Sequence, residues 1–208
     1  VGKSHKTKIN KISKYLKNKK SDFLYISSPE NVAWLLNIRG SDTPFSPLPN
    51  CSLILSKNKK AIFFCNLKKI NKSFKNKFKN IEFVDIKLIY FFLKAIKNKK
   101  VLIDSSSCSI YFENILKKEN SLISHPDPIY FLKSIKSKIE IKNIIKSHVY
   151  DGAALTKFLF WLKKNYLKKN ISEITAQEKL LMYRKKNKKF KFLSFPTISG
   201  SGPNGAII

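Results

Sequence analysis

The sequence predicts an α/β protein in which helices cover a mixed sheet, followed by the start of a second, helix-rich unit. Three observations lead to this prediction. Over residues 81–125, short apolar runs alternate with amphipathic helical segments, as in α/β layers. Two apolar runs at residues 51–56 and 61–65 flank the lysine-rich segment 57–60, which indicates a hairpin. From residue 139 onward the pattern becomes helical.

The first fifty residues predict a helix, a strand, a second helix and a loop. Apolar residues recur at helical spacing over residues 4–20, with lysines between them. Residues 22–27 form a short apolar run typical of a buried strand. Ser28 is suited to cap a helix and Pro29 to occupy its first position, so a short helix is expected there. One glycine and three prolines make residues 37–50 a loop.

The remaining elements divide the chain into two domains, at residues 1–133 and 134–208. Residues 125–138 contain two prolines followed by lysines and are interpreted as the junction. The other expected elements are a helix around 74–78, strands at 81–86, 101–106 and 121–125, helices at 88–96, 110–118, 139–165 and 176–187, a cap region at Ser172 and Thr175, and a glycine-rich turn into a strand near Thr197.

The chain carries a formal net charge of +29, which by itself suggests nucleic acid or an anionic membrane as a partner. Of its 42 basic residues only Arg39 and Arg184 are arginine, and the lysines are spread through nearly every segment. Proteins that read bases or clamp phosphates favour the planar guanidinium. We therefore interpret the lysines as a drift in composition and expect no specific nucleic acid partner.

The cysteines and the hydropathy pattern indicate a cytoplasmic protein. Cys51, Cys65 and Cys108 show no CxxC spacing, so they predict neither a zinc site nor a disulfide framework and fit a reducing compartment. No apolar run of 18 residues occurs, and we expect no membrane partner. The carboxylates of this chain are not joined by a histidine at a useful spacing, so none of them is expected to bind a metal.

Three long strings resemble the aminopeptidase P family of Xaa-Pro aminopeptidases, which are pita-bread metallopeptidases related to prolidase and creatinase. They are NVAWLLNIRGSDTPFSP at 31–47, YDGAALTKFLFWL at 150–162 and LSFPTISGSGPNGAII at 193–208. The likeness extends over essentially the whole chain. It implies that residues 1–133 are a creatinase-like N-terminal-type domain, the second module of a three-module enzyme. Residues 134–208 would then begin the pita-bread α+β catalytic domain and end incomplete.

The same resemblance implies the chemistry and the site residues. The family removes the N-terminal residue from peptides with proline second, using two metal ions, usually manganese, held by two aspartates, one histidine and two glutamates. All five ligands are expected beyond Ile208, so this chain, taken as a truncated fragment, is predicted to have no catalytic or metal-ligating residues and to be inactive alone. The complete enzyme could be a homodimer.

Five residues are expected near the substrate. Arg39 is one of two arginines in a lysine-rich chain, which suggests that its forked guanidinium is needed. It either shapes its own loop, by binding Asp42 or backbone carbonyls, or reaches toward the catalytic mouth together with Asp42. The resemblance also places Gly202, Asn204 and Gly205 beside the substrate peptide, where glycine allows a close approach of the backbone.

Two other hypotheses remain open at this point. The chain could be a basic, non-catalytic module that binds a partner protein or nucleic acid. It could also be a remnant that does not fold stably.

Overall fold

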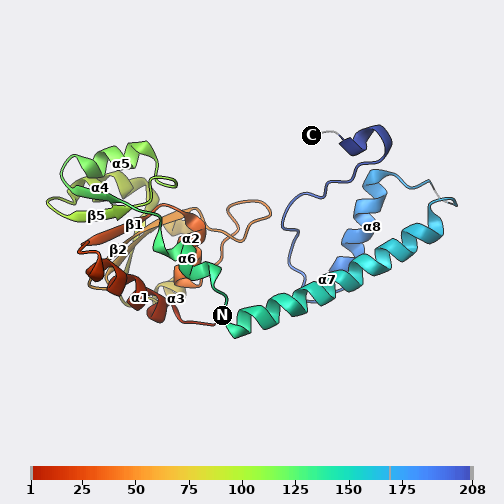
Figure 1. The fold of residues 1–208 in the computed structure, drawn as a ribbon, viewed down its shortest axis with the longest axis horizontal. Coiled ribbons are helices and arrows are strands. Elements are labelled where there is room, and N and C mark those ends of the chain that lie inside the picture. The colour runs from red at the N-terminus through yellow and green to blue at the C-terminus, as the bar shows by residue number, and fades with distance from the viewer. Residues whose placement is uncertain (1, 169, 207–208) are drawn as a thin grey trace. The chain divides into compact units, whose positions relative to one another are not determined.

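The computed structural model describes residues 2–168 and 170–206, and the chain divides into two units, Val1–Lys136 and Ser137–Ile208. The boundary lies three residues beyond the one expected after residue 133. Figure 1 shows an α/β unit in the red to green part of the chain and a helical unit in the blue-green to blue part. Each unit is described separately below.

The first unit is built on one six-stranded mixed sheet with the strand order β4-β3-β2-β1-β5-β6. Its strands are β1 (Phe23–Ile26), β2 (Cys51–Ser56), β3 (Ala61–Cys65), β4 (Ile81–Asp85), β5 (Lys100–Ile103) and β6 (Ser121–Ser124). The expected hairpin is confirmed, since β2 and β3 pair antiparallel with Cys51 opposite Cys65. β1 pairs antiparallel with β2 and parallel with β5, and β5 pairs parallel with β6. The predicted α/β class with a mixed sheet is therefore confirmed.

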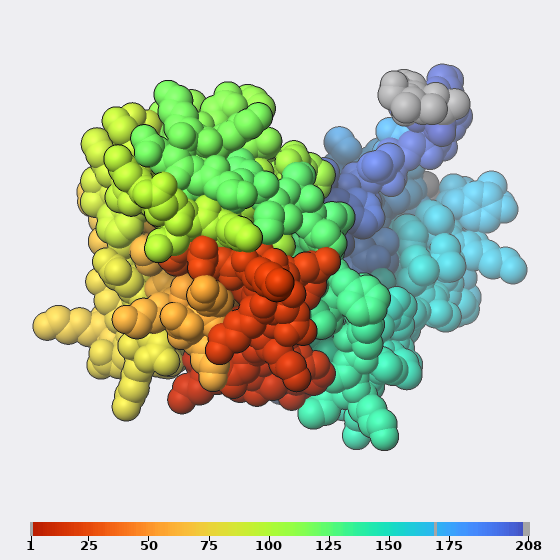
Figure 2. Space-filling model, turned by 60° about the vertical axis from the view of Figure 1, so that its left-hand side comes forward, coloured from red at the N-terminus to blue at the C-terminus, as the bar shows by residue number. Residues whose placement is uncertain are grey.

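Helices cover both faces of this sheet, and each face has its own apolar core. The helices are α1 (His5–Asn18), α2 (Pro29–Leu36), α3 (Lys72–Lys75), α4 (Ile89–Ala95), α5 (Ile110–Lys117) and α6 (Pro128–Ser134), with short 3-10 turns η1 (Leu67–Lys69) and η2 (Ile86–Leu88). Residues of α1, α2 and α6 join one core, and residues of α4 and α5 join the other. In Figure 2 the red N-terminal residues lie below the yellow-green residues that include α4 and α5.

The alternation of side chains along the central strands explains why two layers of helices are needed. Leu53 and Leu55 of β2 point into the core beneath α1, α2 and α6, whereas Ile54 points into the opposite core. Leu53 and Leu55 are 0% exposed and Ile54 is 3% exposed. Successive residues of a strand face opposite sides of a sheet, so a continuous apolar run such as CSLILS requires cover on both sides.

The helix predicted at Pro29 is confirmed, although Ser28 does not cap it in the expected way. Pro29 occupies the first turn, but the Ser28 side chain makes no cap hydrogen bond to the helix. Its hydroxyl instead accepts a hydrogen bond from the Tyr130 hydroxyl at 3.1 Å. The helix ends at Asn37, which adopts the left-handed conformation with φ 57°, as is common for asparagine after a helix.

Polar groups close the edge of the sheet at which the parallel strands β1, β5 and β6 end. Asp104 follows β5, and one of its carboxylate oxygens accepts the backbone N–H of Asp127 at 2.9 Å. The carboxylate of Asp127 accepts the side-chain amide of Asn31 at 2.8 Å and the backbone N–H of Ile129 at 2.9 Å. The ammonium group of Lys133 donates to the side-chain amide oxygen of Asn31 at 2.8 Å. Asn31 is thus bound from both ends by residues in or beside α6.

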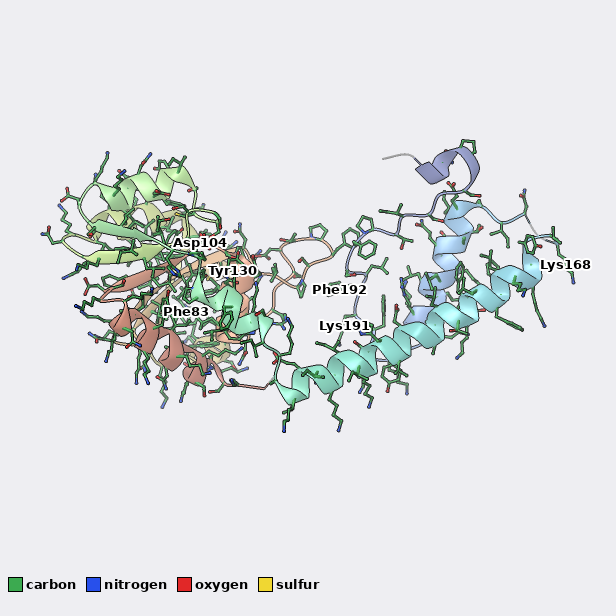
Figure 3. The ribbon with its side chains drawn as sticks, in the orientation of Figure 1. Phe83, Asp104, Tyr130, Lys168, Lys191 and Phe192 are labelled. Atoms are coloured by element: carbon green, nitrogen blue, oxygen red, sulfur yellow. The ribbon has the colours of Figure 1, made fainter. Side chains whose placement is uncertain are left out.

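The boundary between the two units, after Lys136, lies within residues 125–138, and the first part of this stretch is packed into the first unit. Ile129 of α6 is 0% exposed and belongs to the core of the first unit. Pro128 lies in the first turn of α6, and the Asp127 side chain caps this helix. Figure 3 labels Asp104 and Tyr130, which belong to this region of the first unit.

The second unit consists mainly of two helices, α7 (Lys138–Asn165) and α8 (Glu173–Lys185). Both begin with a capping box, from Ser137 to Glu140 and from Ser172 to Thr175, so the cap region predicted at Ser172 is confirmed. Arg184 of α8 grips Asp151 of α7 with two hydrogen bonds, of 2.7 and 3.1 Å. Such a forked pair fixes the two helices side by side.

The strand expected near Thr197 is wrong for the described residues. Residues 196–201 have no regular structure, and Gly202–Ala206 form the 3-10 turn η3. Of the buried apolar residues, only Ala154 lies among the described residues of the second unit. Leu155 and Leu159 of α7 are 40% and 52% exposed. Within residues 2–168 and 170–206, no helix is both long enough and apolar enough to cross a membrane.

We expect limited trypsin digestion of the 208-residue chain to begin after Lys136. The lysines of α7 and α8 are held by few buried contacts, whereas the first unit has two continuous cores, and cleavage follows local unfolding. Mass spectrometry of the early products should show a persistent fragment that ends close to Lys136. Equal resistance along the whole chain would contradict this expectation.

Replacing Asn31 by alanine should destabilise the first unit by about 1–3 kcal/mol, because the Asp127 and Lys133 side chains lose a buried partner. Urea unfolding followed by Trp34 fluorescence, in a Trp161→Phe background, measures this loss. Asn18→Ala is the control, since Asn18 is exposed at the end of α1. Equal midpoints for the two variants would show that the Asn31 network does not hold the sheet edge.

Candidate functional site

The loop between α2 and β2, which contains Arg39 and Asp42, forms one wall of a pocket in the first unit. The pocket has a volume of about 690 Å³, within the range of small-molecule and peptide sites. The facing wall comes from the end of β3 and from η1 and α3. The lining residues are Ile38, Arg39, Gly40, Ser41, Asp42, Pro49, Asn50, Phe63, Cys65, Asn66, Lys69, Ile70, Asn71 and Phe74.

The loop holds its shape through backbone contacts across its base. The N–H of Gly40 donates to the carbonyl of Pro47 at 3.1 Å, and the N–H of Asp42 donates to the carbonyl of Leu48 at 3.3 Å. A Cβ atom on Gly40 would lie 2.5 Å from the Cα and N atoms of Pro49. Only glycine allows the two strands of the loop to approach this closely.

Asp42 is bound from both walls of the pocket. Its carboxylate forms an ion pair with Lys69 and accepts the backbone N–H of Asn50 at 2.8 Å. The hydrogen bond from Lys69, followed by that from Asn50, lowers the pKa of Asp42 below its ordinary value. Asp42 is therefore ionised at neutral pH, and its charge is balanced by Lys69.

Arg39 does not bind Asp42, so one of the two structural roles considered for it is wrong. One of its N–H groups donates to the carbonyl of the preceding residue, Ile38, at 2.8 Å. In the described part of the chain its other N–H groups make no hydrogen bond. The guanidinium is exposed and lines the pocket, which leaves most of its donors available to a ligand.

The other expected site residues lie in the second unit. Asn204 donates to the carboxylate of Glu173 at 3.2 Å, and the same carboxylate accepts the N–H of Ser201 at 2.6 Å. Gly202 has φ +54°, a conformation that favours glycine. A Cβ atom on Gly205 would meet nothing within 4 Å. The glycine-rich segment is thus held to the start of α8 through Glu173.

The sequence did not single out Lys69, Asn66 and Asn71, which complete the pocket around Arg39. The side chains of Asn66 and Asn71 cap η1 and α3 by accepting the N–H of Lys68 at 3.0 Å and of Phe74 at 2.8 Å. An asparagine directly before a helical turn is a recognisable signal. The pairing of Lys69 with Asp42, 27 positions apart, has no local signal in the sequence.

Other groups that could carry chemistry have structural partners. Burial raises the pKa of the Cys51 thiol to about 12 and of the Cys65 and Cys108 thiols to about 11, so these thiols stay protonated and pack as apolar groups. Burial also raises the pKa of Asp127. Within residues 2–168 and 170–206, no group of three or more His, Cys, Asp or Glu side chains could hold a metal ion.

The fold and the matched domain define the family. The model of the creatinase/prolidase N-terminal domain matches residues 1–140, and the chain belongs to this family. It is 32% identical over its full length to a Laccaria bicolor protein named Probable Xaa-Pro aminopeptidase P, and covers 33% of that protein. It is 33% identical over 95% of its length to Xaa-Pro aminopeptidase ApepP of Drosophila melanogaster, and again covers 33%. The resemblance to the aminopeptidase P family is confirmed.

Solved structures agree with this assignment. The X-prolyl aminopeptidase of Caenorhabditis elegans, described as a cytosolic enzyme with a di-nuclear active site, has a TM-score of 0.84 and 25% identity over 93% of this chain and 33% of its own. An Xaa-Pro dipeptidase from Bacillus anthracis has a TM-score of 0.64 at 16% identity over 88% of this chain and 49% of its own, which indicates a shared fold. The chain spans about a third of the length of its curated relatives.

Replacing Gly40 by alanine should disturb the loop and cost about 1–3 kcal/mol of stability in the first unit, because a Cβ atom would collide with the backbone of Pro49. Faster amide hydrogen exchange at Gly40 and Asp42 would report the loss of the two cross-loop hydrogen bonds. Gly152→Ala is the matched control, since a Cβ atom at this helical position meets nothing within 4 Å and alanine favours helix. Unchanged exchange in Gly40→Ala would contradict the tight loop.

Proposed function

We propose that this chain is part of an Xaa-Pro aminopeptidase, a metal-dependent hydrolase that removes the first residue of peptides with proline second. The observation that carries the proposal is the likeness to Xaa-Pro aminopeptidases over 95–100% of this chain, together with the likeness to the C. elegans enzyme over 93% of it. In this proposal the first unit is the creatinase-like module that precedes the catalytic domain. The second unit, α7 to η3, is the beginning of the pita-bread domain.

The two units differ in how completely their apolar side chains are buried, and this difference supports separate roles for them. The first unit has complete cores on both faces of its sheet and can serve as a rigid support. The second unit exposes large apolar side chains, among them Ile145 at 60%, Val149 at 65% and Phe160 at 61%. A pita-bread sheet supplied by further polypeptide would cover them. Each such side chain gains roughly 1.5–3 kcal/mol on burial.

The proposed site lies partly within this chain. We propose a role near the substrate for Arg39 and Asp42 of the first unit and, separately, for Gly202, Asn204 and Gly205 of the second. In the complete enzyme two divalent ions, which we expect to be manganese, would supply Lewis acidity and activate a water for attack on the bond before proline. The residues of this chain would bind and orient the peptide. We propose a cytoplasmic location, in line with the cytosolic C. elegans relative.

The 208-residue chain alone should not cleave an Xaa-Pro-Pro peptide in the presence of manganese, because the described residues offer no cluster of metal ligands. Release of the first residue is followed by mass spectrometry after removal of host peptidases. Calorimetric titration with manganese should reveal no micromolar site. Cleavage by the purified chain would contradict the proposal that it supplies only part of the enzyme.

A chimera tests whether this chain can serve as part of an active Xaa-Pro aminopeptidase. This chain replaces the matching third of the Drosophila relative, and the chimera is assayed beside the unmodified relative. We expect manganese-dependent release of the first residue from an Xaa-Pro-Pro peptide, and no release when proline is replaced by alanine. A folded chimera that binds manganese but cleaves neither peptide would contradict the proposed function.

A further inference from the structure

The pocket beside Arg39 contains side-chain hydrogen-bond donors that have no partner among the described residues. The carbonyl oxygens of the Asn66 and Asn71 side chains are occupied by backbone N–H groups at 3.0 and 2.8 Å. Only the amide oxygen can accept these hydrogen bonds, so the NH₂ group is at the other position of each side-chain amide. Among the described residues, neither side-chain NH₂ group has a hydrogen-bond partner. Together with the guanidinium of Arg39, these groups supply donors at the pocket wall.

The charge of the pocket is positive. Lys69 and Asp42 cancel each other, since they form an ion pair, and the side chain of Asp42 is only 15% exposed. Arg39 then remains as an unbalanced charge, so the ionised lining side chains sum to +1 from two cations and one anion. A guanidinium with free N–H groups binds a carboxylate through two parallel hydrogen bonds.

Part of the pocket lining is apolar. Its most buried lining residues, here called the floor, are Ile38, Phe63 and Cys65, which are 6%, 2% and 5% exposed. Ile70 and Phe74 belong to its walls and are partly buried against the same core. A strongly hydrated dianion such as phosphate would gain nothing from this floor. A ligand that joins one carboxylate to an apolar group would use both the donors and the floor.

We propose that this pocket binds a carboxylate that carries an apolar side group, with the C-terminal residue of a peptide as the natural source. The carboxylate lies against Arg39 and the amide groups of Asn66 and Asn71, and the apolar group lies over Phe63 and Phe74. This inference deepens the substrate role proposed for Arg39 and rests on the proposed function in naming a peptide. The pocket itself is defined by residues of the first unit alone.

Binding is measured on the 208-residue chain by NMR titration with acetyl-Gly-Gly-Phe, which lacks proline. We expect saturable shifts for Asn66, Asn71 and the residues of the Arg39 loop. The C-terminal amide of the same peptide should bind at least tenfold more weakly, because it removes the charge that Arg39 recognises. Titration with 3-phenylpropionate distinguishes a free apolar acid from the C-terminus of a peptide. An affinity equal to that of acetyl-Gly-Gly-Phe would show that a free apolar acid is sufficient. A weaker affinity would show that the peptide terminus is recognised.

Three variants make the test specific. Arg39→Lys keeps the charge but loses the fork, and should weaken binding about tenfold. Asn71→Asp keeps the helix cap, because a carboxylate can still accept the N–H of Phe74, but it replaces a donor with a negative charge; we expect a larger loss than for Arg39→Lys. Arg184→Lys is the matched control, since Arg184 pairs with Asp151 in the other unit and should leave binding unchanged.

The outcomes distinguish this inference from the proposed function. Equal binding of acid and amide, unchanged affinity in a folded Arg39→Lys variant, or absence of saturable shifts would overturn the carboxylate pocket, whatever the chimera does. An inactive chimera together with intact binding would instead contradict the Xaa-Pro aminopeptidase assignment and leave the pocket standing.

Discussion

The first unit depends on how its parallel strands are closed at their carboxyl ends. Asp104 accepts the backbone of Asp127, and Asp127 accepts the amide of Asn31, which is 0% exposed. Although burial acts to raise the pKa of Asp104, hydrogen bonds from Ser106 and from the backbone of Asp127 outweigh it and lower that pKa. A buried carboxylate is tolerated only where such donors surround it. The chain therefore crosses this edge with its polar groups satisfied, and α6 can seal the core beneath β1 and β5.

The same closure sets the place of the Arg39 loop. Asn31 lies on α2, so the network that holds α6 also holds the helix from which the loop departs. At the other end of α2, the buried Lys8 of α1 donates to the carbonyl of Trp34 and to the side chain of Asn37, both at 2.6 Å. Its ammonium group also lies 3.9 Å from the Trp34 ring. With both ends of α2 fixed, Arg39 projects from a rigid base.

Local patterns in the sequence predict most of the first unit. The apolar run Leu53, Ile54 and Leu55 predicts a strand buried on both faces, and Pro29 predicts the start of a helix. Both signals depend on neighbouring residues, so they can be recognised in the sequence. The helix α6 within residues 125–138 was not predicted, because prolines such as Pro126 and Pro128 are common in loops, and proline is also well tolerated at the start of a helix. Burial of Ile129 at 0% exposure shows that this helix packs on the first unit. That tertiary contact has no local signal in the sequence.

The candidate site was only partly predictable, for a related reason. Arg39 stands out by composition and Gly40 by the loop it occupies, but the pocket needs Lys69, Asn66 and Asn71 from a segment about 30 residues away. The antiparallel pairing of β2 with β3, with Cys51 opposite Cys65, brings η1 next to the end of the loop and so places Lys69 near Asp42. The strand predicted near Thr197 is absent from the described residues, where the chain turns back at η3 and a Cβ on Gly200 would lie 2.7 Å from the carbonyl oxygen of Asn204.

The environments of the two arginines support the carboxylate ligand proposed for the Arg39 pocket. Forked phosphate contacts would require arginines, yet Arg184 is engaged by Asp151 and Arg39 stands over an apolar floor. The lysines of the first unit are distributed over α1, α3, α4 and α5, and do not require a common ligand. A single unbalanced guanidinium beside Phe63 and Phe74 suits one carboxylate far better than a repeating chain of phosphates. The feature that sets this site apart is thus the arginine retained within a lysine-rich surface, supported by a loop that only Gly40 can close.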